Sequence, residues 1–515
     1  MSVFLCDADS CRGESLLTVL RRLGFFIDSG CAACGRCGRC RVSVAPLCAP
    51  EKFESVLACA TLVDRDLIVR VPDPPRACAG EDEFRVAVQR CASPRAGGRF
   101  AAALDLGTTT LAAALIDLDT GEVLAHAGCR NPQRRFGADL LSRLQMAGTP
   151  QGLSLLRRTL LDAVGALLAG LAAQLPPKGA MERVAAAGNS VMSLIFHGLD
   201  PSPMGHLPFD PPVYEFPPLT AGDLAWPLPP ETPVMTLPLL SRFVGGDLTA
   251  GLLLLRQKGA LDSSGPVLLM DLGTNGEIIL AHNGRFLAAS TAAGPVFEGG
   301  HIRCGSMAVP GAVDRVDFTA RPPFHTIGDC PPIGLCGSGV FDIVAELLRV
   351  GVLLPSGRFV SPSADLPLPR LARLETLHGQ RAFFLGDSSA GQGDIVVTQG
   401  DIRQFQLAVG AMKAGVEILL QRAGIQVGDL AGLYVAGALG AHLSCASARR
   451  VGLFPEALAD ERLNYLGNSS LEGAALAARF PELGKTASEL RRATETVDLA
   501  GDPDFEARFV RSMRF

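Results

Sequence analysis

The stretch that decides the fold reads Ala101-Ala-Ala-Leu-Asp105-Leu-Gly-Thr-Thr-Thr110 and continues into a second apolar run, residues 111–116. An apolar run, a glycine-containing turn and another apolar run are typical of two strands joined by a tight hairpin. The glycine permits the sharp turn, while exposed N–H groups and threonine hydroxyls can face phosphate oxygens. Asp105 at the strand end can reach a water molecule bound to Mg²⁺. The pattern therefore predicts a phosphate-binding turn.

A second copy of this pattern lies further along the chain. It reads Val267-Leu-Leu-Met-Asp271-Leu-Gly-Thr-Asn-Gly276, and a further turn and strand follow each copy, at residues 119–123 and 283–286. A single D-x-G-T is a weak signal because any hairpin can contain it. Two copies with matching flanks predict two similar lobes that face each other. The alternative is a pair of ordinary Gly/Thr hairpin turns.

A third segment, Leu433-Tyr-Val-Ala-Gly437-Ala-Leu-Gly440-Ala-His, reads as a buried strand, a glycine-rich turn and a helix start. It suits a nucleotide base or ribose that stacks on the backbone, although the same pattern is common in αβ loops. Residues 334–339 open a predicted helix over 340–348, and they form either a tight helix–strand contact or another nucleotide or interface loop. A further helix is predicted with Asp401 as its N-cap and an apolar core stripe over 402–419.

The composition predicts a folded protein of several domains. The 515 residues are 48% hydrophobic and 19% charged, and the formal net charge of −5 argues against a nucleic-acid partner. No run of eighteen uncharged apolar residues occurs, which predicts the absence of a transmembrane helix. The N-terminus lacks the features of a signal peptide, so the expected location is the cytoplasm. The alternation of strands, turns and helices from Phe100 onward predicts the α/β class.

Ten of the fifteen cysteines precede residue 92, and four of them stand in Cys31-Ala-Ala-Cys34-Gly-Arg-Cys37-Gly-Arg-Cys40. In a cytoplasmic chain this usage indicates metal or redox chemistry rather than disulfides. Cys31, Cys37 and Cys40 have the spacing C-x5-C-x2-C, and Cys59 follows as a fourth candidate ligand. This spacing is one residue longer than the plant-type ferredoxin run that holds a [2Fe–2S] cluster.

Two other metal sites are compatible with the same cysteines. With Cys34 included the run becomes C-x2-C-x2-C-x2-C, which suggests a [4Fe–4S] cluster, but it lacks the C-x3-C-P ending of the bacterial run. A zinc site is the other alternative. We favour [2Fe–2S] and interpret Cys34 as a spare thiol. The predicted domains are a β-rich [2Fe–2S] ferredoxin-like domain over 1–74, a linker over 75–98 and a two-lobed ATPase domain over 99–515.

Residues 105–110, 271–276 and 435–440 resemble the first phosphate, second phosphate and adenosine motifs of the actin, sugar-kinase and heat-shock-chaperone ATPase superfamily. Further segments are similar to one branch of it, the reductive activators of corrinoid proteins. These segments are Asn131-Pro-Gln133, Phe136-Gly-Ala-Asp139, Ala187-Gly-Asn189-Ser190 and Gly467-Asn468, together with residues 290–299, 334–339, 398–402 and 406–408. The resemblance covers nearly the whole chain. It implies an α/β fold with two ribonuclease-H-like lobes, as in actin, behind an N-terminal ferredoxin-like domain.

The resemblance also implies a reaction. Corrinoid methyl carriers of methyltransferase systems alternate between Co(I) and methyl-Co(III), and oxidation leaves them as inactive Co(II). An activator of this branch takes an electron from a low-potential donor onto its [2Fe–2S] cluster and delivers it to Co(II), with ATP and Mg²⁺ driving the unfavourable step. Moving one charge through about 100 mV costs about 2.3 kcal/mol, which nucleotide-driven closure can supply. The resemblance also implies a homodimer, while the net charge and the absence of a long apolar run predict no nucleic-acid or membrane partner.

The resemblance assigns roles to individual residues. The cluster ligands implied by the motif are Cys31, Cys37, Cys40 and Cys59. The implied nucleotide site consists of Asp105, Gly107, Thr108, Thr109, Thr110, Asp271, Gly273, Thr274, Asn275, Gly437 and Gly440. Asp105 and Asp271 are also candidates for holding catalytic water or Mg²⁺. Two further candidates for this role are Glu298 and Asp247. Compared with better-known members, the chain has a shorter linker and is expected to lack a middle domain before the first phosphate motif.

Three other classes of protein share part of this pattern. A sugar or carboxylate kinase would contain the ATPase motifs but has no use for a cluster domain. An ATP-dependent activator of a dehydratase or reductase bridges its cluster between two subunits, and Cys304 and Cys336 are the candidate ligands for that arrangement. A redox sensor would use the nucleotide state to signal oxidation of the cluster. Electron delivery to cobalt separates the corrinoid activator from the sensor.

Overall fold

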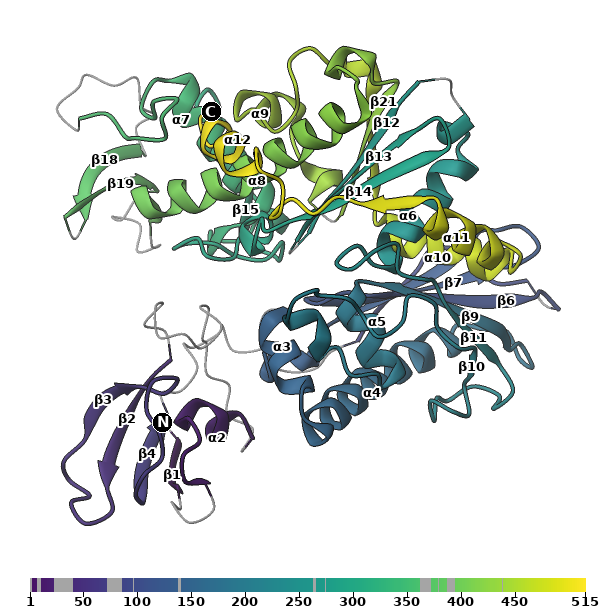
Figure 1. Ribbon diagram of the computed structural model, residues 1–515, viewed down its shortest axis with the longest axis horizontal. Coiled ribbons are helices and arrows are strands. Elements are labelled where there is room, and N and C mark those ends of the chain that lie inside the picture. Colours follow the sequence, from purple (N-terminus) through teal and green to yellow (C-terminus); the bar gives the residue numbers. More distant parts are fainter. Residues whose placement is uncertain are drawn as a thin grey trace. The chain divides into compact units, whose positions relative to one another are not determined.

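The computed structural model describes residues 2–6, 11–22, 40–71, 86–95, 97–137, 140–262, 265–273, 275–361, 372–377, 379–386, 394–437 and 439–515. The chain divides into two compact units (Figure 1). The first unit comprises Met1–Leu237 and Ala477–Pro481, and the second comprises Pro238–Leu476 and Glu482–Phe515. Each unit contains one large mixed β-sheet, and the first also contains a small N-terminal sheet.

The N-terminal sheet is antiparallel, with the strand order β1-β4-β2-β3. Its elements are β1 (Ser2–Cys6), β2 (Arg41–Pro46), β3 (Glu54–Leu57) and β4 (Leu67–Val71), accompanied by α2 (Leu16–Arg22). Val42 and Val44 on β2 and Val69 on β4 are buried, because alternate residues of a strand face the same side of a sheet. Leu16 and Leu20 of α2 pack in the same core. The predicted β-rich N-terminal region is thus present.

The large sheet of the first unit has seven strands in the order β10-β11-β9-β6-β7-β8-β5. They are β5 (Ala87–Arg90), β6 (Phe100–Leu106), β7 (Thr110–Asp117), β8 (Val123–Arg130), β9 (Met181–Gly188), β10 (Leu219–Thr220) and β11 (Pro233–Thr236). β6, β7 and β8 pair antiparallel in succession, whereas β9 runs parallel to β6 and β11 parallel to β9. Helices α3 (Leu140–Ala147), α4 (Pro150–Ala172) and α5 (Ser190–His197) belong to this unit.

The large sheet of the second unit has six strands in the order β22-β21-β12-β13-β14-β23. They are β12 (Val267–Leu272), β13 (Gly276–His282), β14 (Arg285–Thr291), β21 (Gly432–Ala436), β22 (Leu463–Gly467) and β23 (Thr494–Thr496). β12, β13 and β14 pair antiparallel in succession, whereas β21 runs parallel to β12 and β22 parallel to β21.

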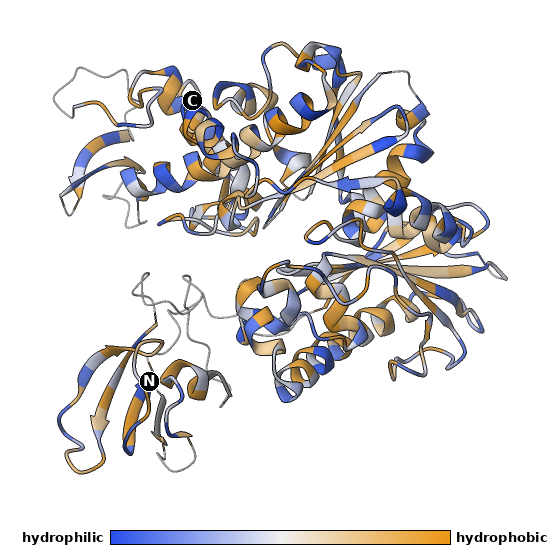
Figure 2. Cartoon of the chain, in the orientation of Figure 1, coloured by the Kyte–Doolittle hydropathy of each residue, from blue (hydrophilic) through white to orange (hydrophobic). Residues whose placement is uncertain are grey.

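The two large sheets share one topology. The order β8-β7-β6-β9-β11 in the first unit corresponds to β14-β13-β12-β21-β22 in the second, with the same pairing directions throughout. In each sheet a D-x-G-T turn joins the first two strands of the unit's antiparallel meander. Apolar residues dominate the strands of both sheets, as sheets with covered faces require (Figure 2). The structure therefore confirms the predicted duplicated α/β lobes.

Further elements complete the second unit. Two three-stranded sheets consist of β15 (Ala312–Val316), β16 (Phe324–Thr326) and β17 (Gly334–Leu335), and of β18 (Ala372–Leu377), β19 (Gln380–Leu385) and β20 (Ile395–Thr398). The helices include α6 (Gly246–Gln257), α7 (Gly337–Arg349), α8 (Gln399–Ala423), α9 (Cys445–Arg450), α11 (Leu483–Arg492) and α12 (Phe505–Ser512). α10 (Ser469–Arg479) begins in the second unit and ends in the first.

Helix α8 begins earlier than the sequence predicts. The N-cap is Thr398 and not Asp401, because the Thr398 hydroxyl accepts a hydrogen bond from the Asp401 N–H while the Asp401 carboxylate accepts from the Thr398 N–H at 2.7 Å. This reciprocal pair is a capping box, in which the acidic residue occupies the third helical position. The predicted apolar stripe is confirmed, since Ile402, Phe405 and Leu419 are all buried.

Part of the stretch predicted as a linker belongs to the first large sheet. Residues 87–90 fall within the predicted linker 75–98, yet they form β5, which pairs antiparallel with β8 from Ala87 opposite Gly128 to Arg90 opposite Ala125. All four residues of β5 are exposed, so burial in a core does not explain why this segment forms a strand. The strand forms because the edge of β8 offers unpaired backbone groups.

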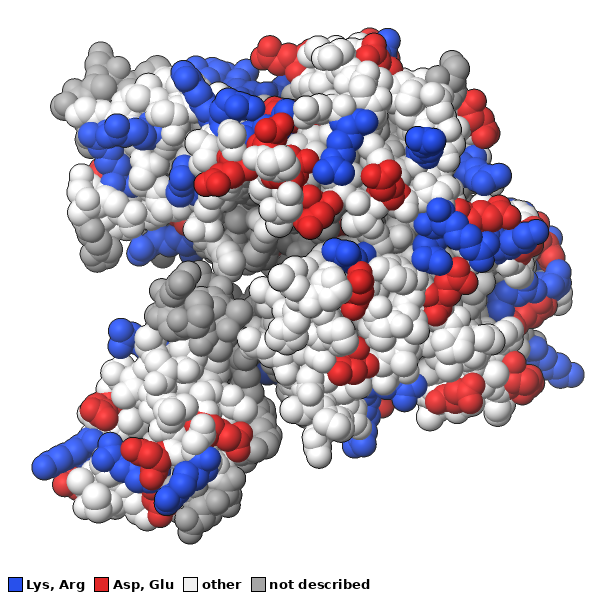
Figure 3. Space-filling view, viewed as in Figure 1, with Lys and Arg blue, Asp and Glu red and all other residues white. Residues whose placement is uncertain are grey.

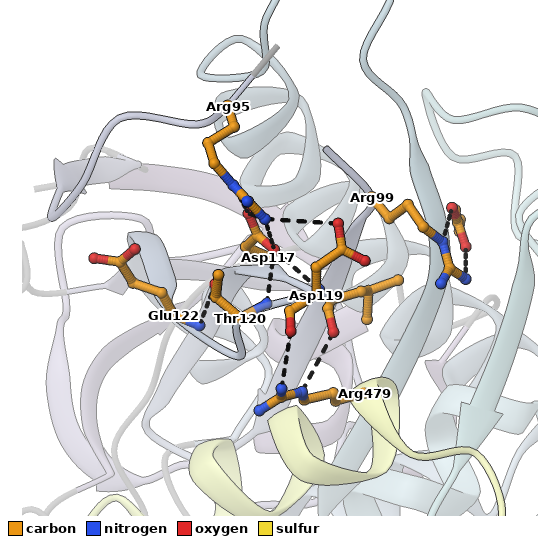
Figure 4. A network of polar contacts seen from close by, with 9 residues as sticks. Arg95, Arg99, Asp117, Asp119, Thr120, Glu122 and Arg479 are labelled. Atoms are coloured by element: carbon orange, nitrogen blue, oxygen red, sulfur yellow. Dashed lines mark hydrogen bonds and ion pairs between the residues drawn. The ribbon is translucent and has the colours of Figure 1, made fainter. Parts of the chain in front are cut away.

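A polar network fixes the β7–β8 turn (Figure 4). The buried Asp117 carboxylate accepts hydrogen bonds from the N–H groups of Asp119 at 2.9 Å and Thr120 at 3.0 Å. Burial alone would raise the pKa of Asp117, but these N–H groups and Arg95 outweigh it and lower that pKa. Arg479, at the end of α10 that belongs to the first unit, donates to the Asp119 carbonyl at 3.1 Å. The network stiffens the end of β7 opposite the turn at 105–110.

The surface and the helices carry two general features. Basic and acidic side chains are interspersed on the face that Figure 3 shows. Among the helices that the structure describes, none combines the length and the apolar character needed to cross a bilayer.

Candidate functional site

Two of the predicted cluster ligands, Cys40 and Cys59, lie side by side. Cys40 directly precedes β2 and Cys59 follows β3 by two residues, and the pairing of Arg41 with Leu57 brings these ends together. The Ala58 N–H continues the ladder by donating to the Cys40 carbonyl at 2.8 Å. The two sulfur atoms are 3.2 Å apart. β-Sheet register therefore accounts for a pair that lies nineteen positions apart in sequence.

The thiol pair has geometry suited to one metal ion. A separation of 3.2 Å exceeds the roughly 2.05 Å of a disulfide bond, so the two sulfurs are not joined. On a tetrahedral metal with sulfur ligands at about 2.3 Å, two sulfurs stand about 3.8 Å apart, which a small side-chain adjustment reaches. Cys40 is fully buried and Cys59 is half-buried. Cys31 and Cys37 lie outside the described residues, and within those residues no group of three or more potential ligands forms a metal site.

The first phosphate motif forms the predicted turn. Asp105 lies near the end of β6, Gly107 is the first residue after this strand, and Thr110 begins β7. A Cβ atom at Gly107 would lie 2.3 Å from the Thr110 carbonyl oxygen, so the turn admits no larger residue. The Thr108 hydroxyl accepts a hydrogen bond from Asn189 Nδ2 at 2.9 Å. Because that bond uses a lone pair of the oxygen, the Thr108 O–H stays available as a donor.

Residues behind this turn hold its carbonyl groups. Asn131 Nδ2 donates to the Gly107 carbonyl at 2.9 Å, and the Asn131 N–H donates to the Thr109 carbonyl at 2.9 Å. Arg143 donates to the Thr108 carbonyl at 2.6 Å and is fully buried. Asn131 belongs to a segment that the sequence singled out by resemblance alone. Arg143 was missed, because its position on α3 becomes adjacent to the turn only in the folded chain.

The second phosphate motif carries a group of carboxylates. Asp271 on β12 pairs across the ladder with Glu277 on β13, and Gly273 and Asn275 form the turn between them. Burial raises the pKa of Glu277 well above its ordinary value, and the negative charges of Asp247 and Asp271 raise it further. Asp247 is the first-turn acid of α6.

This carboxylate group contains one residue that the sequence analysis missed. Glu277 directly follows the motif that ends at Gly276, and an acidic residue at the start of an apolar strand was the available signal. Thr274 lies outside the described residues. Glu298 ends the short helix η4 (Pro295–Glu298), and its proposed role at water or Mg²⁺ stays a prediction.

The adenosine motif contacts the second phosphate motif. Gly437 directly follows β21, which is parallel to β12, so it lies beside the end of β12. Its φ of 91° is in the region that favours glycine, and a Cβ there would lie 2.8 Å from Asp271 Oδ1. The Gly437 N–H donates to the Gly467 carbonyl at 3.0 Å, and Asn468 accepts from the Leu471 N–H in the first turn of α10. Gly440 begins the short helix η8 (Gly440–His442) against Val435.

We expect Gly437→Ala to impair both stability and nucleotide binding. The new Cβ would meet Asp271 Oδ1 and the Leu272 carbonyl, each at 2.8 Å, in a strained backbone conformation. Such strain costs about 1–3 kcal/mol of unfolding free energy. Urea unfolding and nucleotide titration would measure the two effects. Gly428→Ala is the matched control, because a Cβ at Gly428 meets no atom within 4 Å; equal nucleotide affinity in both variants would contradict the account of this contact.

Residues 334–339 form a tight helix–strand contact. Gly334 and Leu335 make β17, and Gly337 begins α7. A Cβ at Gly337 would lie 2.0 Å from the Phe297 carbonyl oxygen, and one at Gly339 would lie 2.1 Å from the Val313 carbonyl oxygen. Close packing therefore explains these glycines without a nucleotide.

Helix α5 links the first phosphate turn to a half-buried histidine. The helix begins after Asn189, which binds Thr108, and ends at His197, whose Nε2 lies 2.9 Å from Thr236 Oγ1. His197 also stacks on Phe216 with ring centroids 4.5 Å apart. Burial, reinforced by the positive charge of Arg157, lowers the pKa of His197 to about 4.

This lowered pKa predicts a pH dependence of stability. In the unfolded chain the pKa of the imidazole is about 6.5. Between pH 6.5 and about pH 4 the unfolded state therefore binds more protons than the folded state. The contribution of the neutral His197 side chain to the free energy of unfolding is therefore complete above about pH 6.5 and is lost as the pH falls toward 4. We expect His197→Gln to show a smaller loss of unfolding free energy between about pH 7 and about pH 5 than the wild type in urea titrations. Parallel losses in both proteins would contradict this assignment.

The fold and these turns define the class of protein. Two lobes whose large sheets share the same five-strand topology, each with a D-x-G-T turn between its first antiparallel strands, place this protein in the actin, sugar-kinase and heat-shock-chaperone (ASKHA) class. Family models match two long segments: residues 265–515 match the C-terminal domain of RACo, the ASKHA domain, and residues 100–258 match the RACo middle region. The chain belongs to the RACo family of reductive activators of corrinoid proteins.

Individual relatives agree with this assignment. The corrinoid activation enzyme RamQ of Eubacterium limosum is 31% identical over 424 residues, 80% of this chain and 70% of that protein. The [Co(II) methylated amine-specific corrinoid protein] reductase of Methanosarcina barkeri is 27% identical over 266 residues, 46% of this chain and 43% of that protein. A solved reductive activator for corrinoid, iron-sulfur protein superposes with a TM-score of 0.71 at 25% identity, covering 99% of this chain and 96% of that one.

The match to the middle region corrects one expectation. The sequence suggested that the chain lacks a middle domain before the first phosphate motif. The RACo middle region instead matches residues 100–258, which include that motif. Residues 100–237 of this match lie in the first unit, and residues 238–258 lie in the second.

Proposed function

We propose that the chain is a reductive activator that transfers one electron to the Co(II) of a corrinoid protein and so forms Co(I), in a reaction coupled to ATP. The observation that carries this proposal is the pair Cys40 and Cys59, whose sulfurs are 3.2 Å apart in a chain of the RACo family. A partly buried thiol pair beside a cysteine-rich segment suits a low-potential metal centre, which a sugar kinase of the same fold does not need.

The donor set fits an iron–sulfur cluster. Thiolates are the ligands that such clusters use, and Cys40 and Cys59 would hold the cluster together with the predicted ligands Cys31 and Cys37. When bound, a [2Fe–2S] cluster supplies a one-electron carrier at low potential. The protein contributes a buried site at Cys40, where the sheet core beneath β2 excludes water, and a half-buried site at Cys59.

The three turns suit ATP with Mg²⁺. The Thr108 hydroxyl oxygen already accepts a hydrogen bond from Asn189. Its O–H group can therefore donate to a phosphate oxygen. Asp105 and Asp271 lie one residue before the ends of the corresponding strands of the two lobes, where a carboxylate can hold a water bound to Mg²⁺. We assign Gly437 and Gly440 to the adenosine and leave Glu298 and Asp247 as candidates for water or Mg²⁺.

The dehydratase-activator alternative has less support. Its cluster would need cysteines of the ATPase lobes at a surface between two subunits. Cys336 is buried, and its thiol lies 3.4 Å from the Val313 carbonyl oxygen. The Cys304 sulfur accepts a hydrogen bond from the Val396 N–H at 3.4 Å. Both thiols thus already serve the packing of the second unit. A homodimer and a separate low-potential electron donor remain part of the proposal.

Electron delivery can be counted directly. The protein would be reduced anaerobically, freed of excess reductant, and mixed with a Co(II) corrinoid protein and ATP. We expect Co(I) absorption to appear while the reduced cluster reoxidises in one-to-one proportion. Reoxidation without Co(I) would favour a sensor or another acceptor. Several corrinoid proteins should be compared, because the sequence does not identify the partner.

A further inference from the structure

A fully buried arginine lies directly behind the first phosphate turn. Arg143, on α3, has 0% of its surface exposed and ranks first by volume among the fully buried side chains that the structure describes. A buried guanidinium is costly unless its donors are satisfied. Arg143 donates to the Thr108 carbonyl at 2.6 Å, the Gly137 carbonyl at 3.2 Å and Gln133 Oε1 at 3.3 Å. Its shortest bond is thus to the phosphate turn itself.

The bond to Thr108 fixes the direction of one peptide group. A trans peptide is planar, and its C=O and N–H point in opposite directions. Since the Thr108 carbonyl points at Arg143, the N–H of Thr109 points away from α3. Asn131 fixes the preceding peptide group, between Gly107 and Thr108, in the same way. Its Nδ2 donates to the Gly107 carbonyl at 2.9 Å, so the Thr108 N–H points away from Asn131.

The same network holds Arg143 in place. Gln133 is fully buried, and its Nε2 donates to the Leu156 carbonyl of α4 at 2.9 Å while its Oε1 accepts from Arg143. Arg143 Nη1 also lies 3.2 Å from Met192 Sδ on α5. α3, α4 and α5 therefore all fix the guanidinium, and through it the turn. Rigid donors that are oriented before the ligand arrives bind a phosphate without a cost of reorganisation.

We propose that Arg143 is a positioning residue for nucleotide binding, which orients the Thr108–Thr109 peptide so that its N–H can donate to a phosphate oxygen of ATP. This inference rests on the proposed ATP site. Arg143 itself does not contact the nucleotide in this proposal. Its effect is on the affinity for the phosphates and not on the electron-transfer step.

Substitution at Arg143 should therefore alter half-saturation by ATP. We expect Arg143→Gln to weaken nucleotide affinity at least tenfold, with the rate at saturating ATP near that of the wild type. Arg143→Lys should fall between the two, because one ammonium cannot bridge the Thr108, Gly137 and Gln133 acceptors as a planar guanidinium does. Titration calorimetry with ATP and the ATP dependence of Co(II) reduction would measure the affinity and the rate.

A matched control and a folding check make the test decisive. Arg135→Gln removes a neighbouring exposed arginine that binds Thr159 at 3.3 Å and leaves the turn alone, so it should keep wild-type affinity. Thermal melts of Arg143→Lys would show whether that variant is folded. A lowered rate at every ATP concentration with unchanged half-saturation would overturn the inference, as would wild-type affinity in both Arg143 variants. Failure of the wild type to bind ATP would instead refute the proposed function.

Discussion

Replacing Cys59 by serine should reduce electron transfer to Co(II) to the background rate while leaving nucleotide affinity unchanged. Serine oxygen is a harder and weaker ligand for iron than thiolate, so the metal centre would be lost or altered. The nucleotide turns are formed by strands of the large sheets, whereas Cys59 belongs to the N-terminal sheet region. Visible absorption, iron content and the rate of Co(I) formation would be measured on the same preparation.

Cys48→Ser is the matched control for this variant. Cys48 is exposed and follows the end of β2 opposite Cys40, so its loss should change neither the absorption nor the rate. Cys37→Ser, in the predicted ligand run, should behave like Cys59→Ser. If Cys59→Ser reduced cobalt at the wild-type rate, the assignment of the thiol pair to the electron carrier would be wrong.

Replacing Asp271 by alanine should remove the stimulation by ATP without bleaching the cluster. The loss of a side chain that holds a ligand of a metal ion typically lowers metal affinity or activity by about 10- to 100-fold. Asp271 lies in the second unit on β12, and the Cys40–Cys59 pair lies in the first, so the absorption spectrum should be unchanged. ATP hydrolysis and Co(I) formation with and without ATP would be compared.

The control for Asp271→Ala is Asp262→Ala. Asp262 is an exposed acid shortly before β12, and its loss removes the same charge from the same unit away from the turn. It should retain full stimulation by ATP. Stimulation retained in Asp271→Ala would show that this turn does not bind the phosphates in the proposed way.

The duplicated lobes were predictable because the signal is local and occurs twice. The apolar runs around Asp105 and Asp271 match strands β6 and β7 and strands β12 and β13. Gly107 is needed in its turn for steric reasons, whereas a Cβ at Gly273 would make only ordinary contacts. The edge strand β5 was missed, because its short alternation of Val86 and Val88 follows the proline-rich and acidic stretch that was interpreted as a linker. Similarly, Thr398 caps α8 through a reciprocal bond with Asp401 that sequence order alone leaves ambiguous.

The candidate site was predictable where its chemistry follows from residue type and spacing. Thiols near a ferredoxin-like spacing indicated a cluster, and sheet register then explained why Cys40 lies beside Cys59. Residues that act through others carry no such signal. Arg143 resembles any helical arginine until α3 packs behind the turn, and Glu277 becomes a perturbed acid only through its burial beside Asp271.

The most direct test of the account is the formation of Co(I) with and without ATP. A Co(II) corrinoid protein, this protein and a low-potential reductant would be mixed anaerobically and followed by visible spectroscopy. We predict Co(I) with ATP and none with a non-hydrolysable analogue or without nucleotide. Formation of Co(I) at the same rate without ATP, or its absence with every corrinoid protein tested despite a fully loaded and reducible cluster, would contradict the account.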